Sequence, residues 1–192
     1  MRVDIVQLAD GEEIMAGAED GRRLLGRLIE SAPRPIRPEL VFLDFKRVRV
    51  ATGSFLRELV LAFRDYCRRN ATNLSPVLAN ANEQVLEELS DLLRVCGDAL
   101  ATCTLDIDGR PSAARVLGHL EKMQRLALDA VIVAGVTDAP SLSKTASEPS
   151  EPGSTKWNNR LAALASKGLV VEMVEGRTKR YRPVLEGLTY GT

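Results

Sequence analysis

The first hundred residues alternate short apolar runs with amphipathic stretches. Val3, Ile5 and Leu8, separated by polar residues, predict an opening strand that ends at the Asp10-Gly11 turn. Residues 40–45 form an almost continuous apolar run, which fits a strand covered by helices on both faces. Shorter extended segments are predicted at residues 48–53, 76–79 and 99–105.

Between these strands, apolar residues recur every three or four positions, as on the buried face of a helix. This spacing predicts helices at residues 18–30, 54–69 and 82–95, and Pro33, Pro35 and Pro38 end the first of them. The second helix is expected to start at Ser54 as its N-cap. Its predicted buried residues are Leu56, Leu59, Val60, Phe63 and Cys67, and its predicted exposed residues are Arg57, Glu58, Arg64, Asp65 and Arg68. The alternation predicts an α/β domain with a mostly parallel or mixed sheet over residues 1–108.

From residue 109 the pattern changes, and a second domain is predicted over residues 109–192. Helices are expected at residues 112–133 and 139–144, followed by a loop rich in Ser, Pro and Glu. The next helix is expected to be capped by Ser154 or Thr155 and to end at Gly168. Its predicted core residues are Trp157, Leu161 and Leu164. Two strands, turning at residues 175–177, complete the domain.

Charge is distributed unevenly along the chain, although Lys+Arg and Asp+Glu are equal at 26 each. Residues 1–108 hold 14 basic and 18 acidic residues, whereas residues 109–192 hold 12 and 8. Between residues 153 and 183, seven basic residues face two acidic ones. This asymmetry favours a C-terminal half that binds nucleic acid.

The chain has little that resembles catalytic or metal chemistry. Its single histidine, His119, is interpreted as a helix-surface or packing residue, and Cys67, Cys96 and Cys103 as small buried hydrophobes. No glycine-rich phosphate loop or paired carboxylate motif is present, so we expect neither enzyme activity nor a cofactor or metal. The N-terminus does not resemble a signal peptide, and the longest apolar run, residues 127–135, is too short to cross a bilayer. A cytoplasmic protein without membrane attachment is expected.

The segment LVFLDFKRVRVATGSFLRELVLAF carries a first family resemblance. Asp44-Phe45, Ser54-Phe55 and Glu58-Leu59 are similar to the signature of the STAS-like family of unknown function, and the resemblance covers about residues 1–105. It implies a non-catalytic STAS-like module that binds a histidine-kinase-like ATPase. In such relatives, a serine that follows an aspartate at the tip of this helix is phosphorylated.

The corresponding tip here reads Ala51-Thr52-Gly53-Ser54, without the aspartate. Ser54 and Thr52 remain candidate phosphorylation sites, because a helix N-terminus favours negative charge, but a plain N-cap hydroxyl is the favoured interpretation. Asp44 is either a functional carboxylate or a bonding partner of the following loop. The expected partner-binding surface consists of Ser54, Arg57, Leu61, Arg64 and Arg68.

The segment NNRLAALASKGLVVEMVEGRTKRYRPV carries a second resemblance. Arg160-Leu161, Leu164, Gly168-Leu169-Val170 and Arg180-Tyr181 are similar to the recognition helix and wing of winged helix-turn-helix regulators of the MarR and ArsR type. The resemblance covers about residues 115–186 and lacks the metal-ligand cluster of the ArsR type. It implies that duplex DNA is contacted by Thr155, Lys156, Asn158, Asn159, Arg160, Arg177, Lys179, Arg180 and Arg182.

Two functions from different classes follow from these patterns. The first is a DNA-binding transcriptional regulator, plausibly a homodimer, in which the STAS-like module senses or binds a partner and the winged helix binds duplex DNA. The alternative is a protein-interaction switch that binds a histidine-kinase-like ATPase, with the winged helix packed on protein rather than on DNA.

Overall fold

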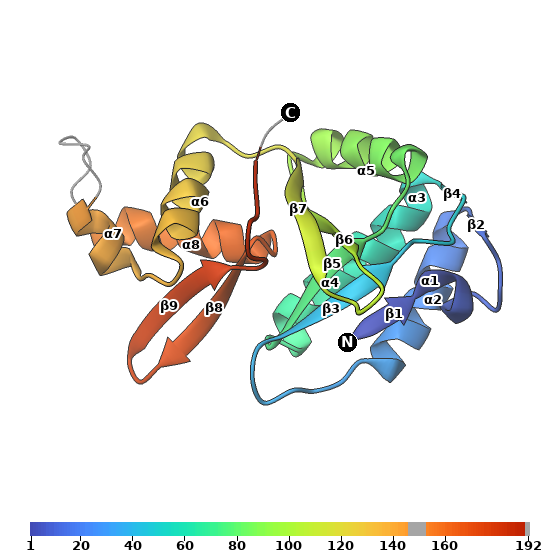
Figure 1. The fold of residues 1–192 in the computed structure, drawn as a ribbon, viewed down its shortest axis with the longest axis horizontal. Coiled ribbons are helices and arrows are strands. Elements are labelled where there is room, and N and C mark those ends of the chain that lie inside the picture. The colour runs from blue at the N-terminus through green and yellow to red at the C-terminus, as the bar shows by residue number, and fades with distance from the viewer. Residues whose placement is uncertain (146–152, 191–192) are drawn as a thin grey trace.

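The protein is an α/β chain in which one sheet carries helices on one face and a second group of helices on the other (Figure 1). The computed structural model describes residues 1–145 and 153–190. The expected loop rich in Ser, Pro and Glu lies mostly outside the described residues.

The main sheet has five strands in the order β1-β3-β5-β6-β7. The first four strands run parallel, and β7 lies antiparallel to β6 at the edge. Their bounds are β1 Arg2–Asp4, β3 Glu39–Asp44, β5 Leu74–Ala79, β6 Ala99–Leu105 and β7 Pro111–Gly118. A small parallel pair, β2 Ile14–Met15 and β4 Val50–Ala51, lies beside the sheet.

Helices of the N-terminal half cover one face of this sheet. They are α1 Ile5–Leu8, α2 Ala18–Ser31, the consecutive segments α3 Gly53–Leu56, η1 Arg57–Leu61 and α4 Ala62–Asn70, and α5 Glu83–Cys96. The segment η1 is a π-helix within an otherwise α-helical run. Val41 and Leu43 of β3 point to this side and share a core with Leu59 and Leu89.

The opposite face packs against the C-terminal half. Its elements are α6 Lys122–Ala134, α7 Ala139–Thr145, α8 Ser154–Ser166 and the hairpin of β8 Val170–Glu175 with β9 Thr178–Pro183. Phe42 and Val77 point to this side and share a second core with Leu128 and Leu161. Because strand side chains alternate between faces, the one sheet contributes to both cores, which join the two halves.

The segment after β9 returns to the main sheet. The backbone N–H of Val116 donates to the Thr189 carbonyl at 2.8 Å, and the Thr189 N–H donates to the Ala114 carbonyl at 3.1 Å. Tyr190 is held nearby, with the Arg125 guanidinium 4.1 Å from its ring centroid. A short extended segment therefore covers the outer edge of β7.

The structure corrects the expected element bounds in three places. Residues 111–118 form strand β7, not the start of a helix, so the sheet extends ten residues past the expected boundary at residue 108. The opening strand ends at Asp4, because the Asp4 side chain caps helix α1. Gly153 precedes α8 without a side-chain cap, so neither Ser154 nor Thr155 caps that helix.

The structure also corrects one expected helix cap and several expected side-chain exposures. Thr52, not Ser54, caps the helix after β4. Leu61 is buried, and the Arg64 side chain is only 12% exposed. Cys96 is exposed, in contrast to the buried Cys67 and Cys103. His119 lies exposed after β7, outside any helix.

Candidate functional site

Helix α8 presents two chemically different faces. Trp157, Leu161 and Leu164 are buried in the second core, as the sequence predicts. Thr155, Lys156, Asn158 and Asn159 are exposed near the start of the helix. Such amide and ammonium groups can donate to, or bridge, base edges and phosphates.

Arg160 has a more confined position than these neighbours. It is half-buried, and its guanidinium lies 5.3 Å from the centroid of the Trp157 ring. The cation–π contact orients the guanidinium along the helix surface. The four exposed residues and Arg160 therefore form a continuous polar surface on the first two turns of α8.

The hairpin that follows α8 is extended by a third short strand segment. Thr137, between α6 and α7, pairs with Tyr181 of β9 through two backbone hydrogen bonds of 2.8 and 2.9 Å. Tyr181 is 1% exposed, and its hydroxyl donates to Glu172 at 3.2 Å. Burial and the charge of Glu172 raise the pKa of Tyr181 to about 12, so the hydroxyl keeps its proton. The base of the hairpin is thereby fixed to the helices.

Two cations of the hairpin are paired with its own carboxylates. Lys179 Nζ lies 2.7 Å from Glu172, and Arg180 lies 3.0 Å from Glu175. Arg182 donates to the carbonyl of Pro183 at 3.4 Å. The hairpin is therefore less cationic than its basic strand suggests. Its exposed turn carries Arg177.

A half-buried ion cluster fixes the end of α8 to the N-terminal half. Asp98 accepts hydrogen bonds from Arg64 at 2.7 Å and from Lys167 at 3.1 Å. Burial raises the pKa of Asp98, but the hydrogen bonds and charge of Arg64 and the Ala99 N–H outweigh it, so the pKa is lower than usual. The Lys167 side chain is 13% exposed, so it lies apart from the exposed polar residues at the start of α8.

A groove runs between β8 and the N-terminal half. It has a volume of about 870 Å³, with β8 and the C-terminal half of α8 on one side. The other side is formed by residues 36–38, the end of α4 and the start of β5, including Arg37 and Arg68. Among the described residues, β8 pairs only with β9, and all six of its residues line the groove. Arg64 Nε, in the groove wall, is the one side-chain nitrogen that is both buried and unbonded among the described residues.

At the tip that holds the candidate phosphorylation sites Thr52 and Ser54, the polar groups bond to other parts of the chain. Thr52 Oγ1 accepts hydrogen bonds from Gly17 N–H and Phe55 N–H and lies 3.2 Å from Ser54 Oγ. The Glu88 carboxylate accepts from Gly53 N–H at 3.1 Å. A phosphoryl group on Ser54 would therefore meet an existing carboxylate at this helix N-terminus, and like charges repel.

Asp44 has a bonding role at the end of β3. Its carboxylate accepts hydrogen bonds from Arg2 at 2.6 Å, Asn80 at 2.8 Å and the Lys46 N–H at 3.0 Å. Burial raises the pKa of Asp44, but these hydrogen bonds outweigh burial and lower it overall. The predicted bond to the following loop is present, and Asn80 connects Asp44 to Leu105 N–H of β6.

The predicted DNA-contacting residues of α8 lie together in the structure, whereas the predicted partner-binding residues do not form one surface. Thr155, Lys156, Asn158, Asn159 and Arg160 form one surface, followed in the chain by the hairpin cations. In the expected partner surface, Leu61 is in the core and Arg64 is bonded to Asp98. Arg57, paired with Glu58, and Arg68 remain exposed.

Sequence reasoning missed Asp98, Glu88 and Thr137, which bond to residues 34 to 69 positions away. The lone acid after Gly97, at the boundary of a helix and a buried strand, is the signal that could have identified Asp98. The positions of Glu88 and Thr137 have no comparable signal.

The described part of the chain holds no group of three or more His, Cys, Asp or Glu side chains that could bind a metal ion. Within the same residues, no helix has the length and apolarity needed to cross a membrane. Comparisons with protein-family models, curated proteins and solved structures find no match to this chain.

Proposed function

We propose that residues 120–185 form a winged helix that binds duplex DNA, with α8 as the recognition helix and the hairpin as the wing. The arrangement of α6, α7, α8 and the β8–β9 hairpin, with Thr137 as a third strand segment, supports this proposal. In Figure 1 the hairpin extends beyond the three helices, and β8 lies across the groove from the start of β5.

One observation carries the DNA-binding part of the proposal. The apolar residues Trp157, Leu161 and Leu164 of α8 are buried in the core, whereas Thr155, Lys156, Asn158 and Asn159 on its first two turns are exposed. Asn158 and Asn159 are suited to adenine edges, and Lys156 and Arg160 to guanine edges or phosphates. The wing contributes phosphate contact chiefly through Arg177, because Lys179 and Arg180 must exchange Glu172 and Glu175 for phosphate.

The N-terminal half is proposed to be a STAS-like module that senses or binds a partner and acts on this winged helix. The shared second core and the Arg64–Asp98–Lys167 cluster support such a connection. A change at the sheet or at α4 would therefore reach the end of α8 through direct contacts.

The test is DNA binding by the purified chain, measured by fluorescence anisotropy with genomic fragments at several salt concentrations. K156Q and R177Q are each expected to weaken binding to all fragments and to reduce the salt slope by about 1, because each removes one phosphate contact. N158A/N159A is expected to reduce the preference between fragments. K46Q, an exposed lysine in the N-terminal half, is the control and is expected to leave binding unchanged. Equal affinity and equal salt slope in K156Q, R177Q and K46Q would refute the proposed surface.

The protein-interaction alternative is favoured by a different observation. Strand β8, which pairs only with β9 among the described residues, lines a groove with Arg37 and Arg68 on the facing wall, and two hairpin cations are already paired. An extended protein segment could add to such an edge strand. Absence of DNA binding at low salt, together with a stoichiometric complex with a purified histidine-kinase-like ATPase, would favour this alternative.

A further inference from the structure

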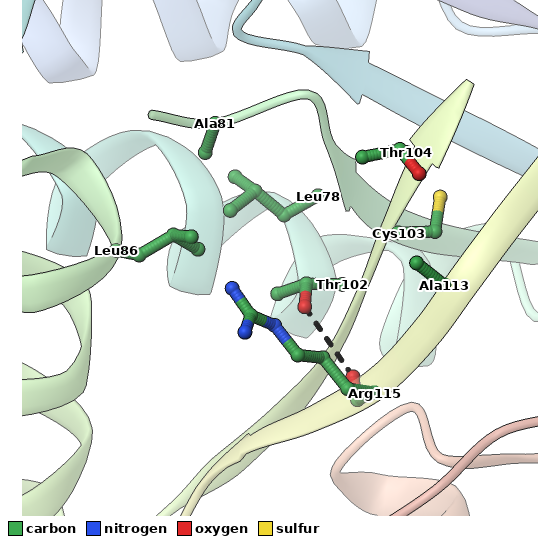
Figure 2. A pocket seen from close by; sticks show the side chains of 8 residues that line it. All are labelled: Leu78, Ala81, Leu86, Thr102, Cys103, Thr104, Ala113 and Arg115. Atoms are coloured by element: carbon green, nitrogen blue, oxygen red, sulfur yellow. Dashed lines mark hydrogen bonds between the residues drawn. The ribbon is translucent and has the colours of Figure 1, made fainter. Parts of the chain in front are cut away.

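A second cavity lies away from α8 and the hairpin, at the carboxyl ends of β5 and β6. It has a volume of about 280 Å³ and is lined by Leu78, Ala81, Leu86, Thr102, Cys103, Thr104, Ala113 and Arg115 (Figure 2). In α/β sheets, the space outside the carboxyl ends of parallel strands is where ligands most often bind. Leu86, in the first turns of α5, and Ala81, just before that helix, form one wall.

The cavity combines an apolar wall with one strong cation. Leu78, Ala81 and Leu86 supply apolar surface, and the Arg115 guanidinium extends across the cavity towards Leu86 (Figure 2). Arg115 is exposed, and none of the ion pairs between described residues includes it. A guanidinium beside an apolar wall can bind a carboxylate through two parallel, charge-assisted hydrogen bonds.

The other polar groups of the cavity are already committed. Thr102 Oγ1 donates to the Arg115 carbonyl at 3.4 Å, and Thr104 Oγ1 donates to the Ser112 carbonyl at 3.2 Å. Each hydroxyl therefore has its proton engaged and offers a ligand only acceptor lone pairs. Recognition of an anion falls to Arg115, which limits the ligand to one anionic group.

The cavity also contains a backbone irregularity that shapes it. The pairing of β6 with β7 shifts register between Thr102 and Thr104. Ala113, opposite this shift, has φ of +48°, in the left-handed region that residues with a Cβ rarely adopt. The bulge brings Ala113 into the lining, two residues before Arg115. Strain of this kind concentrates at ligand sites.

From these observations we propose that the cavity binds a small organic monocarboxylate, with its carboxylate on Arg115 and its apolar body against Leu78, Ala81 and Leu86. The volume accommodates an aromatic or short aliphatic acid. The proposal does not depend on DNA binding, since none of these residues belongs to α8 or the hairpin.

The experiment follows backbone amide NMR shifts of the full chain during titration with benzoate and hexanoate. Benzamide and hexanamide serve as neutral analogues, and inorganic phosphate as an anion without an apolar body. Saturable shifts are expected at Ala81, Thr102, Thr104 and Ala113 with the two carboxylates, and much weaker ones with the amides and phosphate.

Two variants, R115Q and A81L, test the charge of Arg115 and the space of the cavity separately, and R110Q is their control. R115Q is expected to weaken carboxylate binding about tenfold or more, because it removes the charge of the pair. R110Q, an exposed arginine in the same β6–β7 turn region, is the matched control and is expected to bind as the parent does. A81L fills the cavity and retains Arg115, so it is expected to abolish binding, with an unchanged overall spectrum reporting that it folds.

Three results would overturn the proposal. They are the absence of saturable shifts with both carboxylates at millimolar concentrations, equal binding of carboxylates and amides, and equal loss in R115Q and R110Q. Tight binding of phosphate alone would instead identify a general anion site and reject the monocarboxylate class.

Discussion

Lys167 Nζ lies 3.1 Å from Asp98 Oδ1, which connects the end of the last helix to the turn before β6. The two residues are 69 positions apart, and Arg64 of α4 binds the other carboxylate oxygen at 2.7 Å. A single carboxylate thus joins three elements that belong to both halves of the chain.

Replacing Asp98 is expected to destabilise the protein in a pH-dependent way. D98N should lower the free energy of unfolding at pH 7 by about 2 kcal/mol, because it leaves Arg64 and Lys167 facing a neutral group. The folded-state pKa of Asp98 is lowered, so its contribution is complete above the unfolded pKa of about 3.9 and is lost as pH falls through the folded pKa. The difference between parent and D98N should therefore shrink below about pH 4.

Urea unfolding from pH 3 to pH 8 measures this effect. D91N is the matched control, because Asp91 and its partner Arg94 are both largely exposed, and it should change stability little at any pH. A D98N effect that is constant over this range would contradict the assignment.

Two glycines of α2 provide a test of close packing. A Cβ added at Gly21 would lie 2.8 Å from the Glu58 Cβ and 2.9 Å from the Phe55 carbonyl, whereas Gly26 has no atom within 4 Å of such a Cβ. G21A is expected to cost about 1–3 kcal/mol through overpacking. G26A should gain about 0.5–1 kcal/mol, since alanine is the better helix former. Thermal unfolding of both variants checks the difference, and equal effects would show that α2 does not approach η1 this closely.

The shared second core predicts that the two halves unfold together. Leu161 is fully buried among residues of α6 and the main sheet. L161A should cost about 2–5 kcal/mol and reduce hydrogen-exchange protection in β6 as well as in α8. N158A, one turn away and exposed, should leave both unchanged. Loss of protection confined to the C-terminal helices would mean that the halves are separate folding units.

The three cysteines should differ in reactivity. Burial raises the pKa of Cys67 to about 12, and burial with the charge of Asp44 raises that of Cys103 to about 11. Thiolate is the reactive form, so neither should react with a thiol reagent at pH 8 in the folded state. Cys96 is exposed, and a disulfide reagent should label one thiol per chain rapidly. C96S should abolish the fast reaction, and rapid labelling of that variant would contradict the described burial.

The periodicity of the sequence predicted most of the α/β half correctly, including β6 and the buried residues of α5. It failed at residues 111–118 because Leu117 and Leu120 continue the spacing of α6, although Ala114 and Val116 alternate as in a strand. Leu61 was misplaced for a different reason. The π-helical segment η1 inserts a residue into the helix and rotates the following positions, which regular 3.6-residue spacing cannot anticipate.

In the candidate site, the face of α8 was predictable because Trp157, Leu161 and Leu164 mark its opposite side. The ion pairs of the hairpin were less so, since Lys179–Glu172 depends on the register of β8 with β9. The cavity at Arg115 was inaccessible to the same reasoning, because its lining comes from β5, α5, β6 and β7 and includes a bulge.

Thr189 bonds to Ala114 and Val116, so the outer edge of β7 is covered only after Thr189 has been synthesised. During translation, β7 can pair with β6 long before Thr189 exists, so its outer edge stays open while more than seventy further residues are added. An open strand edge is a template for pairing with another chain. Nascent chains stalled before Thr189 should therefore associate through β7, and release of the full segment should end that association.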